Sequence, residues 1–235
     1  MADTKEEQPD YIGHRQRLKE RFKLGNGADM ADYEMLELLL TLAIPRKDTK
    51  PLAKALIKEF GSFAEVLSAA DDKLMAFSGL KENTILVFKL VREAALRMTW
   101  QKLSEQEAPV MTSYDAVVDY CRAASGYKDR EEFRIIFLNA KNRIVAEEVQ
   151  QRGSINSVAI HPREVMRSAV MKGATAIIMV HNHPSGDVTP SRADIEVTKK
   201  IYEALATTDI RLIDHFIVSK NLVYSFNDHG LLPRR

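Results

Sequence analysis

The N-terminal part of the chain carries apolar residues at the spacing typical of helices. Residues 33–42 (YEMLELLLTL) hold apolar side chains too densely for a surface helix, which predicts a buried one. Residues 51–60 begin with Pro51, a favourable residue at the front of a helix, and stop just before Gly61. Residues 84–100 follow a long amphipathic pattern. We therefore expect helices, and no strand, in this part of the chain.

The pattern changes in the C-terminal part. Residues 133–139 (FRIIFLN) are rich in β-branched and aromatic side chains and predict a strand. Residues 176–180 (AIIMV) are a short, wholly apolar run, typical of a central strand buried on both faces. We expect further strands at residues 143–150, 211–219 and 222–226, and helices at residues 113–123, 162–171 and 191–206. This mixed order predicts an α/β sheet of about five or six strands wrapped by helices.

These patterns divide the chain into four parts. Residues 1–12 are mostly polar and are expected to form a disordered tail. Residues 13–101 form the predicted helical domain. Residues 102–110 include the polar stretch KLSEQEAP, which is typical of a linker. Residues 111–235 form the mixed domain.

Composition excludes some classes of protein. A formal net charge of +1 gives no strong attraction to nucleic acid or to a membrane surface. The chain has no run of about 18 apolar residues, so we expect no membrane span and no membrane partner. The N-terminal residues lack the apolar core of a secretory signal. Cys121 is the lone cysteine, and a reducing cytoplasm is the simplest setting for such a chain.

Candidate chemistry gathers directly after the apolar run at residues 176–180. His181 and His183 continue that strand at period two, which places both imidazoles on one face. Ser191 and Asp194 open the next predicted helix, which returns a carboxylate to the end of the strand. Two imidazoles and one carboxylate are the ligand set of a catalytic zinc site, because a fourth position stays open. The pattern therefore predicts a Zn²⁺ ion that activates water for hydrolysis of an amide-type bond.

A structural interpretation of the same residues stays open. Ser191 and Asp194 also fit a helix N-cap with an acidic residue at its third position. The two interpretations are compatible, since one carboxylate oxygen is enough to reach a metal ion. His181 and His183 by themselves could form a polar strand end, although the Pro184 and Gly186 that follow them favour a built site.

The span from His181 to Asp194 (HNHPSGDVTPSRAD) resembles the H-x-H-x7-S-x2-D signature of the JAMM (MPN-plus) metalloproteases. Three flanking segments, GSINS from Gly153, HPRE from His161 and DHFIV from Asp214, are similar to the bacterial RadC-like branch. The resemblance covers residues 111–235. It implies a JAMM/MPN-type, cytidine-deaminase-like α+β or α/β domain, with a mixed sheet wrapped by helices. A helix-hairpin-helix-like region precedes that domain in the branch, and residues 13–101 resemble it.

The resemblance also implies residue roles. His181, His183 and Asp194 match the zinc ligands, and Ser191 matches a serine that stabilises the tetrahedral oxyanion. A glutamate before an early strand acts as the general base in the family. Glu131 is the preferred candidate here and Glu132 the alternative, with Glu164 a weaker third candidate; strand alternation would point the first two in opposite directions.

Further residues receive structural interpretations. Asp214 and His215 lie inside an apolar strand pattern, so a hydrogen-bonded structural role is favoured over a second catalytic pair. Asn182 is expected to tie the ligand loop together. Residues 77–81 (FSGLK) occupy the place of a DNA-binding hairpin but contain one glycine where that pattern usually has two. A structural helix pair is the favoured interpretation there.

Three hypotheses follow for function. The first is a zinc-dependent hydrolase, a metallopeptidase or isopeptidase, acting on a protein or peptide substrate. The alternative is a DNA-associated repair or recombination protein that makes weak DNA contact through residues 13–101 and uses the zinc domain as a scaffold or nuclease. The third is a protein-interaction scaffold that keeps the metal without catalysis.

Overall fold

The computed structural model describes residues 10–106, 109–110, 114–152 and 160–233. The chain divides into two compact units, Met1–Glu93 and Ala94–Arg235. Most of the tail predicted at residues 1–12 lies outside the described residues. The segment GSINS from Gly153, one of the three compared with the RadC-like branch, also lies outside them. The first helix begins at Asp10, so it includes the last three residues of the range predicted as a tail.

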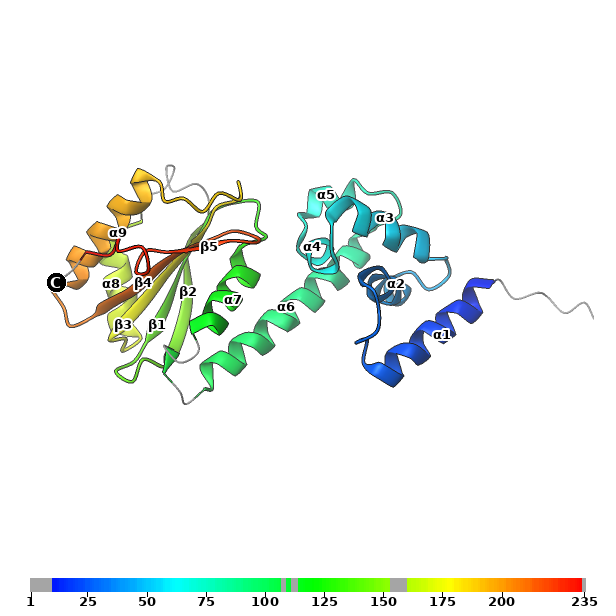
Figure 1. Ribbon diagram of the computed structural model, residues 1–235, viewed down its shortest axis with the longest axis horizontal. Coiled ribbons are helices and arrows are strands. Elements are labelled where there is room, and N and C mark those ends of the chain that lie inside the picture. Colours follow the sequence, from blue (N-terminus) through cyan, green and yellow to red (C-terminus); the bar gives the residue numbers. More distant parts are fainter. Residues whose placement is uncertain (1–9, 107–108, 111–113, 153–159, 234–235) are drawn as a thin grey trace, which may run out of the picture. The chain divides into compact units, whose positions relative to one another are not determined.

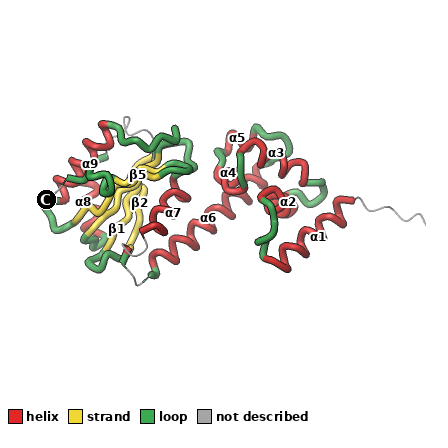
Figure 2. Tube along the Cα trace, in the orientation of Figure 1, coloured by secondary structure: helices red, strands yellow, loops and turns green. Residues whose placement is uncertain are grey.

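The described part of the first unit contains helices and no strand, as its apolar pattern predicts (Figure 2). The helices are α1 (Asp10–Gly25), α2 (Asp32–Ala43), α3 (Lys50–Phe60), α4 (Phe63–Ser68), α5 (Asp71–Met75) and α6 (Glu82–Ser104), the last of which continues into the second unit. Pro51 lies in the first turn of α3, and the Ser62 hydroxyl caps α4 by accepting a hydrogen bond from the Glu65 N–H. None of the helices within the described residues is long and apolar enough to cross a bilayer.

One apolar cluster holds the first unit together. Leu36 and Leu40 of α2, Leu56 of α3 and Phe88 of α6 are fully buried in it. The dense apolar run at residues 33–42 is thus buried on one face only, and the prediction of a wholly buried helix is wrong, since Leu42 on the same helix is 69% exposed. Burying such side chains contributes about 1.5–3 kcal/mol each, so this cluster is the main source of stability in the unit.

The second unit contains a five-stranded mixed sheet (Figures 1 and 2). Its strands are β1 (Glu132–Leu138), β2 (Ile144–Arg152), β3 (Ala176–Asn182), β4 (Arg211–Val218) and β5 (Val223–Ser225), in the order β2-β1-β3-β4-β5. The β1–β2, β1–β3 and β4–β5 pairs are antiparallel, and β3 and β4 are parallel. Five strands lie within the expected range, and β4 and β5 form the predicted hairpin.

Helices cover both faces of this sheet (Figure 1). On one face α7 (Tyr114–Ser125) packs through Val117, Tyr120 and Cys121 against the strands. On the other face lie α8 (Pro162–Met171) and α9 (Arg192–Leu205). All seven residues of β3 are buried, because the strand is central and covered on both sides. This agrees with the wholly apolar run at residues 176–180, and the burial extends to His181 and Asn182.

A β-bulge in β4 decides which side chains of that strand face the candidate site. Ile177 pairs with Leu212 but Ile178 pairs with Asp214, so Ile213 is an extra residue. Leu212 belongs to the apolar cluster under α8 and α9, whereas Asp214 contacts α7 through Tyr114. The extra residue therefore shifts the alternation and puts His215 on the α9 face, where it contacts Thr198.

Candidate metal centre

The two histidines lie at the end of β3 and face each other. His181 is the sixth residue of the strand and is fully buried, and His183 follows directly after the strand. Their Nε2 atoms lie 3.0 Å apart. The period-two argument therefore predicts their arrangement correctly, since both imidazoles project from one face.

Asp194 joins the histidines from the first turn of α9. Its Oδ1 lies 3.2 Å from His181 Nε2, and its Oδ2 lies 3.5 Å from His183 Nε2. The same carboxylate accepts a hydrogen bond from the Ser191 N–H at 2.7 Å, while Ser191 Oγ accepts one from the Asp194 N–H at 3.2 Å. Ser191 and Asp194 thus form a capping box, and Asp194 also lies beside both imidazoles, so capping does not exclude metal binding by Asp194.

The spacing of these atoms fits a tetrahedral zinc ion. One donor atom from each of His181, His183 and Asp194 lies within 4.8 Å of the others. Nitrogen and oxygen ligands at zinc distances of about 2.0–2.1 Å are separated from one another by about 3.3 Å in a tetrahedron. The shortest contacts between the side chains, 3.0 to 3.5 Å, are near this value, and His181 and His183 meet different oxygen atoms of Asp194. Among the described residues, no second group of three such donors comes together.

The pKa shifts of His181 and Asp194 favour the forms of these side chains that bind a metal ion. Burial lowers the pKa of His181, against the opposing effect of Asp194. Burial acts to raise the pKa of Asp194, but its hydrogen bonds with His181 and His183 outweigh burial and lower it. The hydrogen bond with Asp194 raises the pKa of His183, which favours its protonated form, so His183 must lose a proton to bind a metal ion. A carboxylate beside a neutral, buried imidazole is the form in which these groups bind a cation.

The turn after β3 orients His183. Its Nδ1 lies 2.7 Å from the Asp187 carbonyl oxygen, which can only accept a hydrogen bond. The Nδ1 atom therefore carries a proton and donates it, which makes Nε2, on the side of Asp194, the atom that could bind a metal ion. Gly186 allows this turn, because its φ of 89° lies in a region that side-chain-bearing residues rarely adopt.

Strand register separates the two leading glutamate candidates. Phe133 lies directly opposite His181 in the β1–β3 pair, and Glu131 shares its alternation with Phe133. The negative charge of Glu131 acts to raise the pKa of both His181 and His183, which places it electrostatically beside the cluster. Glu132 belongs to the opposite face, where its carboxylate pairs with Lys128 at 2.5 Å and Arg134 at 2.8 Å.

Asn182, between the two histidines, holds the backbone on both sides of Glu131. Its Oδ1 accepts a hydrogen bond from the Glu132 N–H at 2.8 Å, and its Nδ2 donates one to the Arg130 carbonyl at 3.1 Å. Asn182 is fully buried. The prediction that Asn182 ties the ligand loop together is therefore wrong, because its side chain instead binds the segment that carries Glu131.

The remaining sequence candidates have other contacts. Glu164, on α8, pairs with Arg163 and Arg167. Asp214 accepts hydrogen bonds from the hydroxyl groups of Tyr114 and Ser225 and from two backbone N–H groups. This arrangement agrees with the structural role predicted for Asp214.

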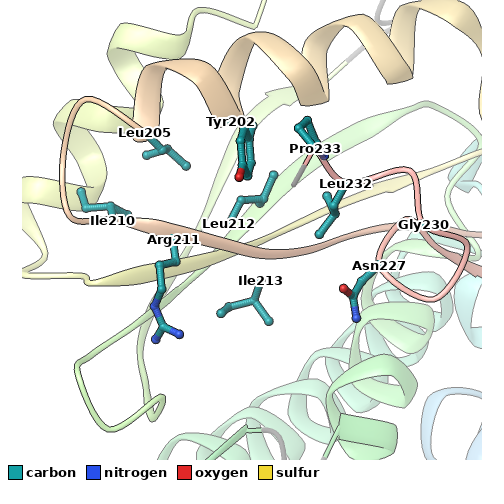
Figure 3. A pocket seen from close by; sticks show the side chains of 10 residues that line it. All are labelled: Tyr202, Leu205, Ile210, Arg211, Leu212, Ile213, Asn227, Gly230, Leu232 and Pro233. Carbon is teal, nitrogen blue, oxygen red and sulfur yellow. The ribbon is translucent and has the colours of Figure 1, made fainter. Parts of the chain in front are cut away.

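A separate cavity of about 370 Å³ lies between α9, the start of β4 and the C-terminal segment (Figure 3). Its lining includes Tyr202, Leu212 and Leu232. Arg211, also in the lining, pairs with Ala176 at the start of β3, whereas the candidate metal site lies at the other end of that strand. The cavity is therefore not part of the metal centre.

Two residues of the site were not assigned to it from the sequence. His215 lies 2.8 Å from His181 Nδ1, and Thr198 lies 2.6 Å from His215. A signal for Thr198 exists, because it follows Asp194 by four residues and so shares its helix face. His215 has no comparable local signal, since its orientation depends on the bulge in β4.

Fold and site together define a class of protein: a mixed α/β domain with two histidines at a strand end and an aspartate in the next helix. The family model described as RadC-like JAB domain matches residues 111–231, which is more than half of the chain. The chain belongs to the RadC-like JAB family. The resemblance seen in the signature from His181 to Asp194 is thereby confirmed.

Proposed function

We propose that this chain is a zinc-dependent hydrolase of peptide or isopeptide bonds that acts on a protein or peptide substrate in the cytoplasm. One observation carries the proposal: His181, His183 and Asp194 offer donor atoms within 4.8 Å of one another, in a chain of the RadC-like JAB family. When bound, zinc would polarise the scissile carbonyl group and activate a water molecule. His181, His183 and Asp194 would hold it.

Glu131 is the proposed general base. It would take a proton from the attacking water and deliver it to the leaving nitrogen. Three observations support this role. Glu131 lies on the same strand face as Phe133, which pairs with His181, and its negative charge acts to raise the pKa of both histidines. Asn182 also hydrogen-bonds to the backbone on either side of Glu131. Glu132 is less suited, because two cations already bind its carboxylate.

Ser191 is proposed to stabilise the tetrahedral oxyanion. Its Oγ accepts a hydrogen bond from the Asp194 N–H, which leaves the hydroxyl proton available for another acceptor. The residue is exposed at the start of α9, next to the Asp194 carboxylate. A donor at this place would act where negative charge develops, and such donors contribute about 10²–10³-fold to kcat.

Zinc content and hydrolysis together test this proposal. The probe is a pool of internally quenched peptides that includes lysine-isopeptide-linked members. We expect Glu131→Gln to retain zinc and to lose hydrolysis by about 10²-fold or more. Glu164→Gln is the matched control, because that carboxylate pairs with arginines on α8, and it should keep both properties. Equal hydrolysis by Glu131→Gln and wild type would refute the assignment of the base.

A second candidate function, weak DNA contact by the helical unit, rests on one observation. A cavity of about 620 Å³ adjoins Ser78 and Gly79 and is also lined by Arg46, Lys47 and Lys81. Cations beside a glycine turn suit phosphate contacts. We expect a salt-dependent gel shift of duplex DNA by the full chain that weakens in the Lys47→Glu, Lys81→Glu variant. Absence of a shift at low salt would remove this candidate.

A further inference from the structure

A chain of hydrogen bonds runs behind the candidate metal ligand His181. His181 Nδ1 lies 2.8 Å from His215 Nε2, and His215 Nδ1 lies 2.6 Å from Thr198 Oγ1. All three side chains are buried, so water does not compete for these bonds. These hydrogen bonds connect α9 to β4 and β4 to β3.

The positions of the protons in these hydrogen bonds follow from the Thr198 end. Thr198 Oγ1 lies 2.5 Å from the Asp194 carbonyl oxygen, which can only accept, so the Thr198 hydroxyl proton is used there. Thr198 Oγ1 must then accept a proton from His215 Nδ1. A neutral imidazole protonated at Nδ1 has its lone pair on Nε2, so His215 accepts the Nδ1 proton of His181. The Nε2 lone pair of His181 is thereby directed toward His183 and Asp194.

We propose that Thr198 and His215 are positioning residues that hold His181 in the Nδ1-protonated tautomer and so increase the affinity of the site for zinc. The inference rests on the proposed zinc site and deepens it. Both residues act through His181, and neither belongs to the group of candidate metal ligands, His181, His183 and Asp194.

Packing alone does not account for these residues. His215 stacks on Phe226 with ring centroids 4.6 Å apart and meets the Phe133 ring edge-on at 5.9 Å. A phenyl ring would fill the same space, but it would offer no acceptor to His181. The Nδ1 partner of His183 is a backbone carbonyl, whereas the Nδ1 partner of His181 is the His215 side chain, which in turn contacts Thr198. Both of these side chains can be replaced one at a time.

Replacement of Thr198 in the full chain tests this relay, the hydrogen bonds that run from Thr198 through His215 to His181. Thr198→Val keeps the shape and removes the acceptor, so His215 can move its proton to Nε2 and donate toward His181 Nδ1. The His181 proton then moves to Nε2, the nitrogen needed for the metal. We expect zinc affinity, measured by competition with a chromogenic chelator, to fall by about 10-fold or more. Thr198→Ser restores the hydroxyl group and should stay within about twofold of wild type.

His215 provides an independent pair of variants. His215→Phe keeps a ring between Phe133 and Phe226 and should weaken zinc binding by about 10–100-fold. His215→Gln offers a side-chain oxygen as an acceptor for His181 Nδ1–H and should recover part of that loss. This rescue separates an effect on hydrogen bonding from an effect on packing.

The tautomer of His181 can be read directly from ¹⁵N side-chain resonances of the zinc-free protein, assigned by the signal missing in His181→Ala. We expect Nδ1–H in the wild type and in Thr198→Ser, and a shift toward Nε2–H in Thr198→Val. If Thr198→Val keeps both the Nδ1–H tautomer and wild-type zinc affinity, the relay is overturned. A wild-type chain that binds no zinc would overturn the proposed function instead, while the resonances of the zinc-free chain would still decide the tautomer.

Discussion

The Glu132 backbone N–H donates a hydrogen bond to the Asn182 side-chain oxygen across the β1–β3 pair, at 2.8 Å. This bond links the residue between the two histidines to the segment that carries Glu131. The geometry of the candidate base thus depends on the same short motif as the geometry of the metal ligands.

Asn182→Ala should therefore damage hydrolysis while leaving zinc in place. It leaves the Glu132 N–H and the Arg130 carbonyl without their partner, which destabilises the fold by about 2 kcal/mol. Asn139→Ala is the control, since Asn139 Oδ1 accepts two backbone N–H bonds in the β1–β2 turn. Urea unfolding should show a loss for both variants. Hydrolysis of the peptide pool should fall only for Asn182→Ala, and an equal fall for both would contradict the positioning role.

Ser191→Ala separates capping from catalysis. The change removes an N-cap, which costs about 1 kcal/mol, and under the proposed function it also lowers kcat by about 10²–10³-fold. Ser62→Ala is a matched control, because Ser62 Oγ accepts from the Glu65 N–H at 3.2 Å, the same length as the Ser191 bond. Unfolding and kcat are measured for both variants. A Ser191→Ala chain that loses stability but keeps kcat would leave Ser191 with a structural role alone.

Stability should depend on pH through Glu132. Burial acts to raise its pKa, but Lys128 and Arg134 outweigh burial, so the pKa in the folded chain is below its usual value. A carboxyl group of this kind stabilises the fold above its unfolded pKa of about 4.3, and this contribution is lost as pH falls through the lower folded pKa. Glu132→Gln should therefore lower the free energy of unfolding by about 1–3 kcal/mol at pH 7, and by less near pH 3.5, which lies below the unfolded pKa of about 4.3.

Urea unfolding at both pH values measures this difference. Glu203→Gln, at an exposed carboxylate 3.9 Å from Lys199, should change little at either pH. A loss for Glu132→Gln that is the same at pH 7 and pH 3.5 would show that the ion pairs with Lys128 and Arg134 are not its cause.

Local pattern was enough to predict much of the fold. The apolar run of β3, the proline at the front of α3 and the serine cap of α9 each act within a few residues of the chain. The same holds for the two histidines, because period two places His181 and His183 on one face whatever surrounds them.

Other parts of the site depend on register between strands. The choice between Glu131 and Glu132 needs the pairing of Phe133 with His181, two residues far apart in the sequence. The orientation of His215 needs the bulge at Ile213, which strict alternation of apolar and polar residues does not anticipate. Such pairings arise from packing of the whole sheet, so single-sequence patterns do not contain them.

The zinc content of the purified full chain tests the central claim most directly. Metal is measured by mass spectrometry after dialysis against zinc-free buffer, for the wild type and for the His181→Ala, His183→Ala double variant. We predict about one zinc ion per wild-type chain and almost none in the double variant, because the variant removes two of the three proposed ligands. A wild-type chain that neither carries nor rebinds zinc, or a double variant that keeps it, would contradict the account.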